Sequence, residues 1–289
     1  MTISELKKYF SENLKEIYTE SESVFIFQVF VENILAINSI QQRQLADQEI
    51  NSENEEKFLQ IISELQTGKP YLQILGETEF YGMKFFVDEN VLIPRPETEE
   101  LLELAIQKIK TSENYQTLRL SNAPIKILDI GTGSGVIPLV LKKYFPQAEV
   151  TSIDFSEKAL ETAKKNAAFH QLEVNFIHAD YLNDDLNENF DVIISNPPYI
   201  GIDEEEEIAD SVKEFEPKMA LFSPTSDTLI FYRKIANDAE KFLNKNGLLF
   251  LEINQKLGSE TADLYTEKLA EVQLIKDLSG NDRFIFGLK

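Results

Sequence analysis

The sequence predicts an α/β protein in which a small helical domain precedes a doubly wound, mostly parallel β-sheet. Three observations predict this fold. The first 67 residues contain neither glycine nor proline, short apolar runs from residue 125 onward alternate with amphipathic segments, and a glycine-rich turn follows the first of those runs. Regular alternation of strand and helix is typical of a parallel sheet with helices on both faces.

Residues 1–75 are predicted to form the helical domain. Leucine, isoleucine, glutamate, glutamine and lysine dominate this region, and most of these residues favour helices. Two groups of apolar residues recur at the spacing of one helix face, Phe27-Val31-Ile34-Leu35 and Phe58-Ile61-Ile62-Leu65. Asn51, at a polar break between the two groups, is expected to cap the second helix.

Residues 76–98 are predicted to form a linker that contains a β-hairpin. Glycines and prolines separate two short runs of strand-forming residues, Glu79–Tyr81 and Lys84–Val87. Arg95 lies between two prolines, and we expect it to anchor the linker by pairing with a carboxylate, with contact to the substrate as the second interpretation.

Residues 99–289 are predicted to form the sheet domain. Helices are expected from Glu97 to about Lys110, from the glycine turn to Tyr144, from Ser156 as its cap to His170, and over Thr228–Leu243. The predicted strands are, in chain order, Ile125–Ile130, Glu149–Ile153, Val174–His178, Asp191–Ser195, Gly247–Ile253, Val272–Ile275 and Arg283–Phe286.

Composition and charge exclude several classes of function. The chain holds 28 Lys and Arg against 50 Asp and Glu, and its net charge of −22 disfavours binding to a nucleic-acid backbone. With no cysteine and two histidines, the sequence predicts neither disulfides nor a metal site. We see no membrane span and no secretory signal, and we expect a soluble, cytoplasmic monomer.

The glycine-rich turn is the first motif that indicates a ligand. A dinucleotide-binding turn would carry its third glycine at position 136, which is Val136. Asp129 would repel a pyrophosphate, but it suits a ligand with an ammonium group, such as S-adenosylmethionine. The candidate cofactor-binding residues of this motif are Asp129, Gly131, Thr132, Gly133, Ser134 and Gly135.

Two further strand ends carry candidate cofactor-binding residues. Asp154 ends the second strand, where a carboxylate can accept hydrogen bonds from a ribose diol. Asp180 and Tyr181 follow the third strand. Asp180 could accept from an adenine amino group and Tyr181 could pack on the adenine ring, although a role as ordinary loop residues explains this pair almost as well.

The sharpest motif is Asn196-Pro197-Pro198-Tyr199, directly after a predicted strand. The two prolines have no N–H and offer only carbonyls. The Asn196 side-chain oxygen and the Pro197 carbonyl can therefore converge on one planar NH₂ group, with Tyr199 as an aromatic wall. We assign catalysis to Asn196, Pro197 and Tyr199, and substrate binding to all four residues.

These motifs together predict methyl transfer from a sulfonium donor to a planar nitrogen. An amide nitrogen is a weak nucleophile, because its lone pair is delocalised into the carbonyl. Accepting both of its N–H groups enriches that nitrogen and fixes its orientation. No strong general base is evident, so the proton is expected to leave to water.

The chain resembles the peptide chain release factor N5-glutamine methyltransferases, the HemK/PrmC family. Its Asn196–Tyr199 motif is similar to that of N-methyltransferases that act on adenine, cytosine or glutamine, and the segment Leu92-Ile-Pro-Arg-Pro-Glu-Thr-Glu99 narrows the choice. The resemblance runs from about residue 68 to the end and includes Glu252-Ile253 and the tail Asp277–Arg283. Tyr181 stands where many members carry tryptophan.

This resemblance implies a class I S-adenosylmethionine-dependent methyltransferase with a Rossmann-like, seven-stranded sheet. It implies methylation of the glutamine side chain in the Gly-Gly-Gln tip of class 1 release factors, with the N-terminal domain helping to recognise that partner. Gly131–Gly135, Asp154, Tyr181 and Asn196 would contact the cofactor, and Asn196–Tyr199 would hold the glutamine.

Two alternatives remain open. A ribosomal-protein glutamine methyltransferase would share most motifs, whereas an adenine-N6 methyltransferase of DNA or RNA would need a basic groove that this acidic chain lacks. The acidic run Asp203–Glu207 is read as a solvated segment, with a lid that attracts a basic partner as the second interpretation.

Overall fold

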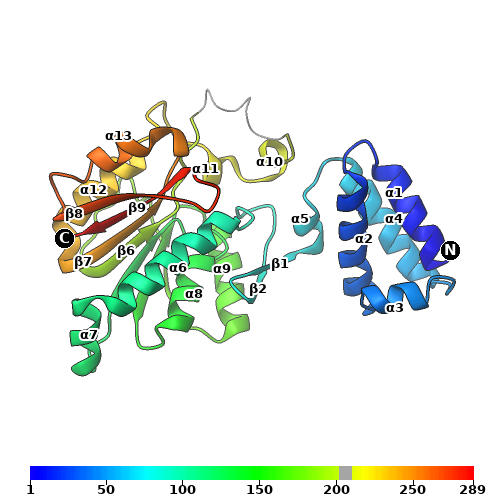
Figure 1. Cartoon of the computed structure of the whole chain (residues 1–289), viewed down its shortest axis with the longest axis horizontal. Helices are drawn as coiled ribbons and strands as arrows, with labels where there is room; N and C mark the ends of the chain where they lie inside the picture. Colours follow the sequence, from blue (N-terminus) through cyan, green and yellow to red (C-terminus); the bar gives the residue numbers. More distant parts are fainter. Residues whose placement is uncertain (202–209) are drawn as a thin grey trace. The chain divides into compact units, whose positions relative to one another are not determined.

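The computed structural model describes residues 1–201 and 210–289 and divides into two compact units (Figure 1). The first unit comprises Met1–Gly76 together with the short helix α10, Asp210–Phe215, and the second comprises the rest of the described chain. The acidic run Asp203–Glu207 lies outside the described residues.

The first unit is the helical domain. Its core consists of aromatic and aliphatic side chains such as Leu6, Phe10, Phe27 and Phe58, each at most 1% exposed. The Asn51 side chain accepts a hydrogen bond from the Asn54 backbone N–H, which confirms the expected cap. The helices are α1 (Ile3–Leu14), α2 (Glu20–Leu35), α3 (Ser39–Gln44), α4 (Ser52–Gln66) and α5 (Tyr71–Leu75).

The predicted hairpin is confirmed and belongs to the second unit. Its strands are β1 (Glu77–Phe80) and β2 (Met83–Phe86), paired antiparallel. The Asn166 side chain accepts from the Phe86 N–H at 2.7 Å and donates to the backbone oxygens of Phe86 and Ser134, at 3.0 and 2.8 Å. The hairpin is thereby tied to the glycine-rich turn.

A seven-stranded sheet forms the centre of the second unit, in the order β5-β4-β3-β6-β7-β9-β8. The first five strands of this order are parallel. Strand β9 pairs antiparallel with both β7 and β8, so β9 alone runs against the other six strands. Strand order reverses between β3 and β6, where carboxyl ends of an open sheet typically bind ligands. The strands are β3 (Lys126–Ile130), β4 (Glu149–Asp154), β5 (Asn175–His178), β6 (Phe190–Ser195), β7 (Leu243–Glu252), β8 (Glu271–Lys276) and β9 (Asp282–Leu288).

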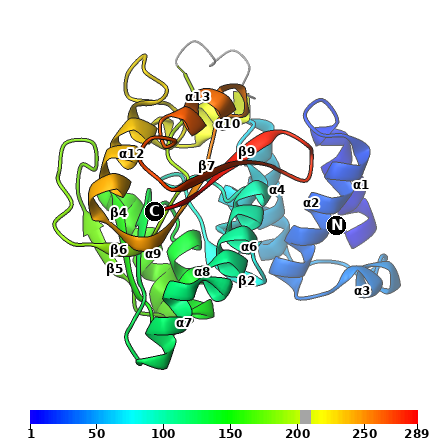
Figure 2. The same ribbon diagram turned by 60° about the vertical axis from the view of Figure 1, so that its left-hand side comes forward.

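Helices cover both faces of this sheet (Figure 2). Alternate strand residues face opposite sides, so Ile127 packs with α6 and α8, whereas Leu128 packs with α12. The helices are α6 (Pro96–Thr111), α7 (Glu113–Leu120), α8 (Val136–Tyr144), α9 (Glu157–His170), α11 (Lys218–Leu221), α12 (Ile230–Phe242) and α13 (Gly258–Asp263), with a short 3₁₀ turn at Gln255–Leu257. None of the described helices is long and apolar enough to cross a membrane.

Most predicted elements are confirmed within a few residues, and the differences have local causes. The helix α7 was not predicted, because none of its residues is fully buried and only Tyr115 and Leu118 pack, partly exposed, against the core, which leaves a weak apolar pattern in the sequence. Strand β7 begins at Leu243, where the preceding helix was expected to end, because Leu243 pairs with Phe190 of β6.

Candidate functional site

The glycine-rich turn joins β3 to α8 and is held in an unusual backbone conformation. Gly131, Gly133 and Gly135 have φ of +90°, +52° and +85°, a region that side chains disfavour. A Cβ at Gly135 would lie 3.1 Å from the Cβ of Ala163, whereas one at Gly133 would meet nothing within 4 Å. Gly135 thus permits close helix packing, and Gly133 opens onto free space.

Asp129 lies behind this turn. Its Oδ2 accepts from the Ser152 hydroxyl at 2.6 Å, and Thr132 Oγ1 lies 2.6 Å from the same Ser152 oxygen. Asp129 is 0% exposed, and burial raises its pKa to about 8. Its Oδ1 has no hydrogen-bond partner among the described residues. The structure therefore connects Asp129 to the turn through Ser152 and Thr132, and direct contact with a ligand ammonium group stays a prediction.

Asp154, at the end of β4, bonds the turn directly. Its Oδ2 accepts from the Gly133 N–H at 2.9 Å, and its Oδ1 accepts from the Ser156 N–H at 2.8 Å. Burial raises the pKa of Asp154, and the two N–H donors oppose that rise. Asp154 lines the same cavity as the glycines.

Asp180 and Tyr181 line this cavity from the loop after β5. Asp180 accepts from the Leu182 N–H and the Asn183 side chain, at 3.2 and 2.8 Å. The Tyr181 hydroxyl donates to the buried carboxylate of Asp238 at 2.8 Å, and the Lys234 ammonium bonds that carboxylate as well. Tyr181 is 6% exposed, and its ring is fixed by its hydroxyl.

The Asn-Pro-Pro-Tyr segment follows β6. Asn196, Pro197 and Pro198 line the cavity. Tyr199 packs behind them against the core beside α12, and burial raises its pKa well above the usual range for tyrosine. The Asn196 side-chain NH₂ donates to Thr98 Oγ1 at 3.2 Å.

The cavity has a volume of about 780 Å³ and lies at the carboxyl ends of β3, β4 and β6. This volume is within the range of small-molecule and cofactor sites. Its walls come from the hairpin-to-α6 segment, the glycine-rich turn, the strand ends, the segment around α11, and α12. The cavity is shared by Gly131–Ser134, Asp154, Asp180, Tyr181 and Asn196–Pro198, as their positions after parallel strands suggested. Of the predicted site residues, Asp129, Gly135 and Tyr199 do not line it.

Several cavity residues escaped the sequence reasoning. Arg95 was expected to pair with a carboxylate, and its guanidinium bonds Glu216 at 2.6 Å, yet Arg95 also lines the cavity. Thr98 and Lys234 contribute as well. Thr98 stands inside a motif that carried the family resemblance, and that motif was its only signal in the sequence. Its contacts with Asn196 and Glu252, 98 and 154 residues away, leave no local pattern.

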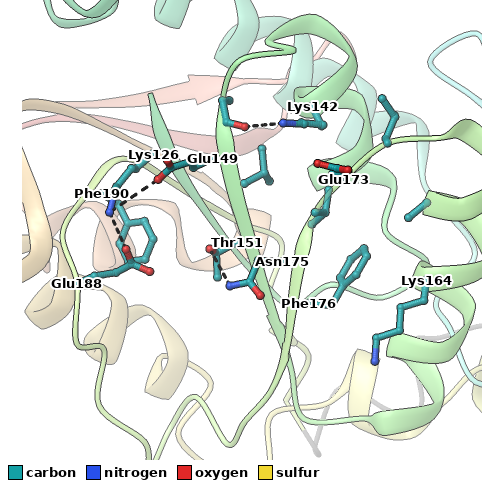
Figure 3. A pocket seen from close by; sticks show the side chains of 15 residues that line it. Lys126, Lys142, Glu149, Thr151, Lys164, Glu173, Asn175, Phe176, Glu188 and Phe190 are labelled. Atoms are coloured by element: carbon teal, nitrogen blue, oxygen red, sulfur yellow. Dashed lines mark hydrogen bonds and ion pairs between the residues drawn. The ribbon is translucent and has the colours of Figure 1, made fainter. Parts of the chain in front are cut away.

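A second hollow of about 630 Å³ lies at the opposite, amino-terminal edge of the same strands (Figure 3). Three of its charged side chains are engaged with one another, since the Lys126 ammonium pairs with Glu188 at 2.8 Å and with Glu149 at 3.9 Å. None of the predicted site residues lines it. The candidate functional site is therefore the cavity at the carboxyl edge.

Comparisons with known proteins agree with this geometry. A family model described as "Methyltransferase small domain" matches residues 115–214. A release factor glutamine methyltransferase from Flavobacterium psychrophilum is 42% identical over 99% of this chain and 98% of its own length. One from Streptococcus pneumoniae is 38% identical over 99% and 98%.

Solved structures agree on the fold. A 16S rRNA methyltransferase from T. thermophilus, solved with AdoMet and guanosine, superposes with a TM-score of 0.50 at 19% identity. The match covers 74% of this chain and 49% of that one. At this level of identity the likeness concerns the fold, which is that of the class I methyltransferases.

Proposed function

Because this chain belongs to the release factor glutamine methyltransferase family, we propose that it methylates the side-chain amide nitrogen of the glutamine in the Gly-Gly-Gln tip of release factors. The observation that carries the proposal is that Asn196–Pro198 and the glycine-rich turn line one cavity. A methyl donor on the turn and an amide at the Asn-Pro-Pro segment would therefore meet.

The turn fits S-adenosylmethionine, which supplies an electrophilic methyl group when bound. Gly133 faces free space, as a residue against which a ligand packs should. Gly131–Ser134, Asp154, Asp180 and Tyr181, which line the cavity, would hold the cofactor. Gly135 packs against Ala163 and would support the turn. Asp129, whose pKa burial raises to about 8, lies behind the site with an unpartnered Oδ1. A cationic ligand nearby would favour the ionised form of this carboxyl group.

Asn196 and Pro197 would hold the substrate amide. Since Pro197 and Pro198 have no N–H, this stretch of backbone offers acceptors and no donors. The Pro197 carbonyl oxygen is one acceptor, and the Asn196 side-chain oxygen is the second. Two acceptors match the two N–H groups of a primary amide. The arrangement orients the nitrogen and raises its electron density, and we expect its proton to leave to solvent.

The net charge favours a protein substrate over nucleic acid. An adenine-N6 methyltransferase would use a similar pocket but must also hold a polyanion, which a chain of net charge −22 disfavours. A ribosomal-protein glutamine methyltransferase would meet no such obstacle, and that alternative is left to experiment.

The roles of the domains, the oligomeric state and the cellular location are also proposals. We propose that residues 1–75 help to recognise the release factor, with residues 76–98 leading into the catalytic domain of residues 99–289. We further propose that the enzyme acts as a monomer in the cytoplasm. The large share of the chain that its relatives match supports one shared domain plan.

One assay tests the function. The protein is incubated with labelled S-adenosylmethionine and, in parallel, with a class 1 release factor, its Gly-Gly-Gln→Gly-Gly-Ala mutant, a mixture of ribosomal proteins, and duplex DNA. We expect label in the intact release factor alone. Label in DNA, or label retained by the tip mutant, would contradict the proposal, and label in a ribosomal protein alone would support the first alternative.

A further inference from the structure

A buried chain of hydrogen bonds extends from Asn196 into the protein. The Asn196 side-chain NH₂ donates to Thr98 Oγ1 at 3.2 Å, and Thr98 Oγ1 donates to Glu252 Oε2 at 2.7 Å. Thr98 is 3% exposed and Glu252 is 1% exposed, so bulk water does not compete for these bonds. The three residues come from the loop after β6, from α6 and from the end of β7.

The number of available hydrogen-bond protons fixes the donor and the acceptor in each bond of this hydrogen-bonded chain. An ionised carboxylate can only accept, so the single Thr98 hydroxyl proton is used in the bond to Glu252. Thr98 can then only accept from Asn196, which requires the Asn196 NH₂ to face Thr98. The Asn196 Oδ1 is consequently turned away from Thr98 and is available to accept from a ligand.

We propose that Glu252 and Thr98 are positioning residues that set the polarity of the Asn196 side chain, so that the site accepts a primary amide and rejects a carboxylate. The inference rests on the proposed function, because it concerns the same pocket. It explains how an asparagine, whose two faces have opposite polarity, presents its oxygen rather than its NH₂.

The protonation state of Glu252 should then control the site. Burial raises the pKa of Glu252 to about 7, and the nearby charge of Glu97 on α6 raises it further. The hydrogen bonds from Thr98 and Tyr199 and the positive charge of Arg283 on β9 lower this pKa. From α12, Tyr232 donates to the Glu252 backbone oxygen rather than to the carboxylate. A protonated Glu252 can donate to Thr98, which frees the Thr98 proton for Asn196 Oδ1 and permits the inverted amide.

The variant Thr98→Val tests this series of hydrogen bonds, because it removes the hydroxyl group at nearly constant side-chain volume. We expect kcat to fall about 10- to 100-fold, with the dissociation constant of S-adenosylmethionine little changed, and Thr98→Ser to restore most of the activity. Thr162→Val is the matched control, since Thr162 is also buried and also donates to a carboxylate, that of Asp88 at 2.7 Å. Equal effects of the two valine variants would refute a specific role for Thr98.

Specificity and pH provide readouts that a merely structural role would not move. Wild-type enzyme should bind a Gly-Gly-Gln peptide in preference to a Gly-Gly-Glu peptide, and Thr98→Val should lose that preference. The wild-type rate should fall as pH drops below about 7. In Glu252→Gln this fall in rate at low pH should be absent. A rate that still falls at low pH in Glu252→Gln would overturn the proposal.

An activity-independent measurement separates this inference from the proposed function. With ¹⁵N-asparagine labelling, the Asn196 side-chain amide signal, assigned by its loss in Asn196→Ala, should titrate with a midpoint near pH 7. It should not titrate in Glu252→Gln. If the release factor is not methylated but this signal titrates, the function fails and the polarity control stands. If methylation occurs and the signal is insensitive to pH, the polarity control fails.

Discussion

Asn196 is the residue on which the proposed reaction depends most directly. The proposed reaction assigns its Oδ1, together with the Pro197 carbonyl oxygen, to the N–H groups of the substrate amide, and its NH₂ donates to Thr98. Pro197 and Pro198 line the cavity beside it, while Tyr199 lies behind and supports the segment through core packing. The assigned catalytic roles of these residues stay predictions that single substitutions can test.

Asn196→Ala should reduce methyl transfer by about 100-fold or more, because an acceptor that orients and enriches the amide is lost. Binding of S-adenosylmethionine, measured by calorimetry, should be largely unchanged. Asn189→Ala, an exposed asparagine in the same unit, is the control and should retain full activity. Full activity in Asn196→Ala would remove Asn196 from the mechanism.

Two glycines with similar constraints allow the ligand effect to be separated from backbone strain. Gly133 and Gly280 have φ of +52° and +87°, and an added Cβ meets nothing within 4 Å at either position. Both alanine variants should lose about 1 kcal/mol of stability from the left-handed backbone. Only Gly133→Ala should also weaken cofactor binding, by about tenfold or more. Equal affinities in calorimetry would place the cofactor elsewhere.

At the scale of elements, helix caps and apolar periodicity were readable because their causes are local. Ser156 caps α9 by accepting from the Ala159 N–H, as its position before that helix predicted. The amphipathic α12 was predicted within about two residues at each end. By contrast, α7 and α11 were not predicted, since one has no fully buried residue and the other has only four residues.

Asn51→Ala should destabilise the helical unit by about 1 kcal/mol, because the Asn54 N–H loses its cap. Asn33→Ala is the control in the same unit, at an exposed position inside α2, where alanine is the better helix former and stability should hold or rise slightly. Chemical denaturation followed by circular dichroism measures both. A loss in Asn33→Ala equal to that in Asn51→Ala would argue against the cap.

At the scale of the whole molecule, buried carboxyl groups link folding to pH. Asp129 has a pKa raised from 3.8 to about 8 by burial, and Glu252 has one raised to about 7. Between the unfolded and folded values, the native state holds a proton that the unfolded chain releases. Stability contributed by such groups is therefore greatest at low pH and is lost as pH rises toward the folded pKa.

Asp129→Asn should flatten this dependence. The free energy of unfolding of the wild-type protein should fall between about pH 5 and pH 7 more steeply than that of the variant, by up to about 1.4 kcal/mol per pH unit. Asp263→Asn, at an exposed position on α13, should leave the slope unchanged. Urea denaturation of the ligand-free protein across this range provides the measurement, and parallel slopes for all three proteins would contradict it.

The net charge of −22 also acts over the whole molecule. A basic, RNA-binding release factor should be attracted at long range, and salt screens such attraction. Affinity for the release factor should therefore fall steeply as sodium chloride is raised. A flat salt response would count against electrostatic capture, whereas cofactor affinity serves as the control that should vary little.

The sequence alone determined the features whose causes lie close along the chain. Strand–helix alternation, helix caps, the left-handed glycines and the donor-free Pro-Pro segment each depend on a few neighbouring residues, and together they predicted the fold class and the residues at the strand ends. The tertiary structure decided which of these groups face one cavity and which support it from behind. Asn196, Thr98 and Glu252 are far apart in sequence, and only the packing of α6 and β7 beside the end of β6 brings them within hydrogen-bonding distance.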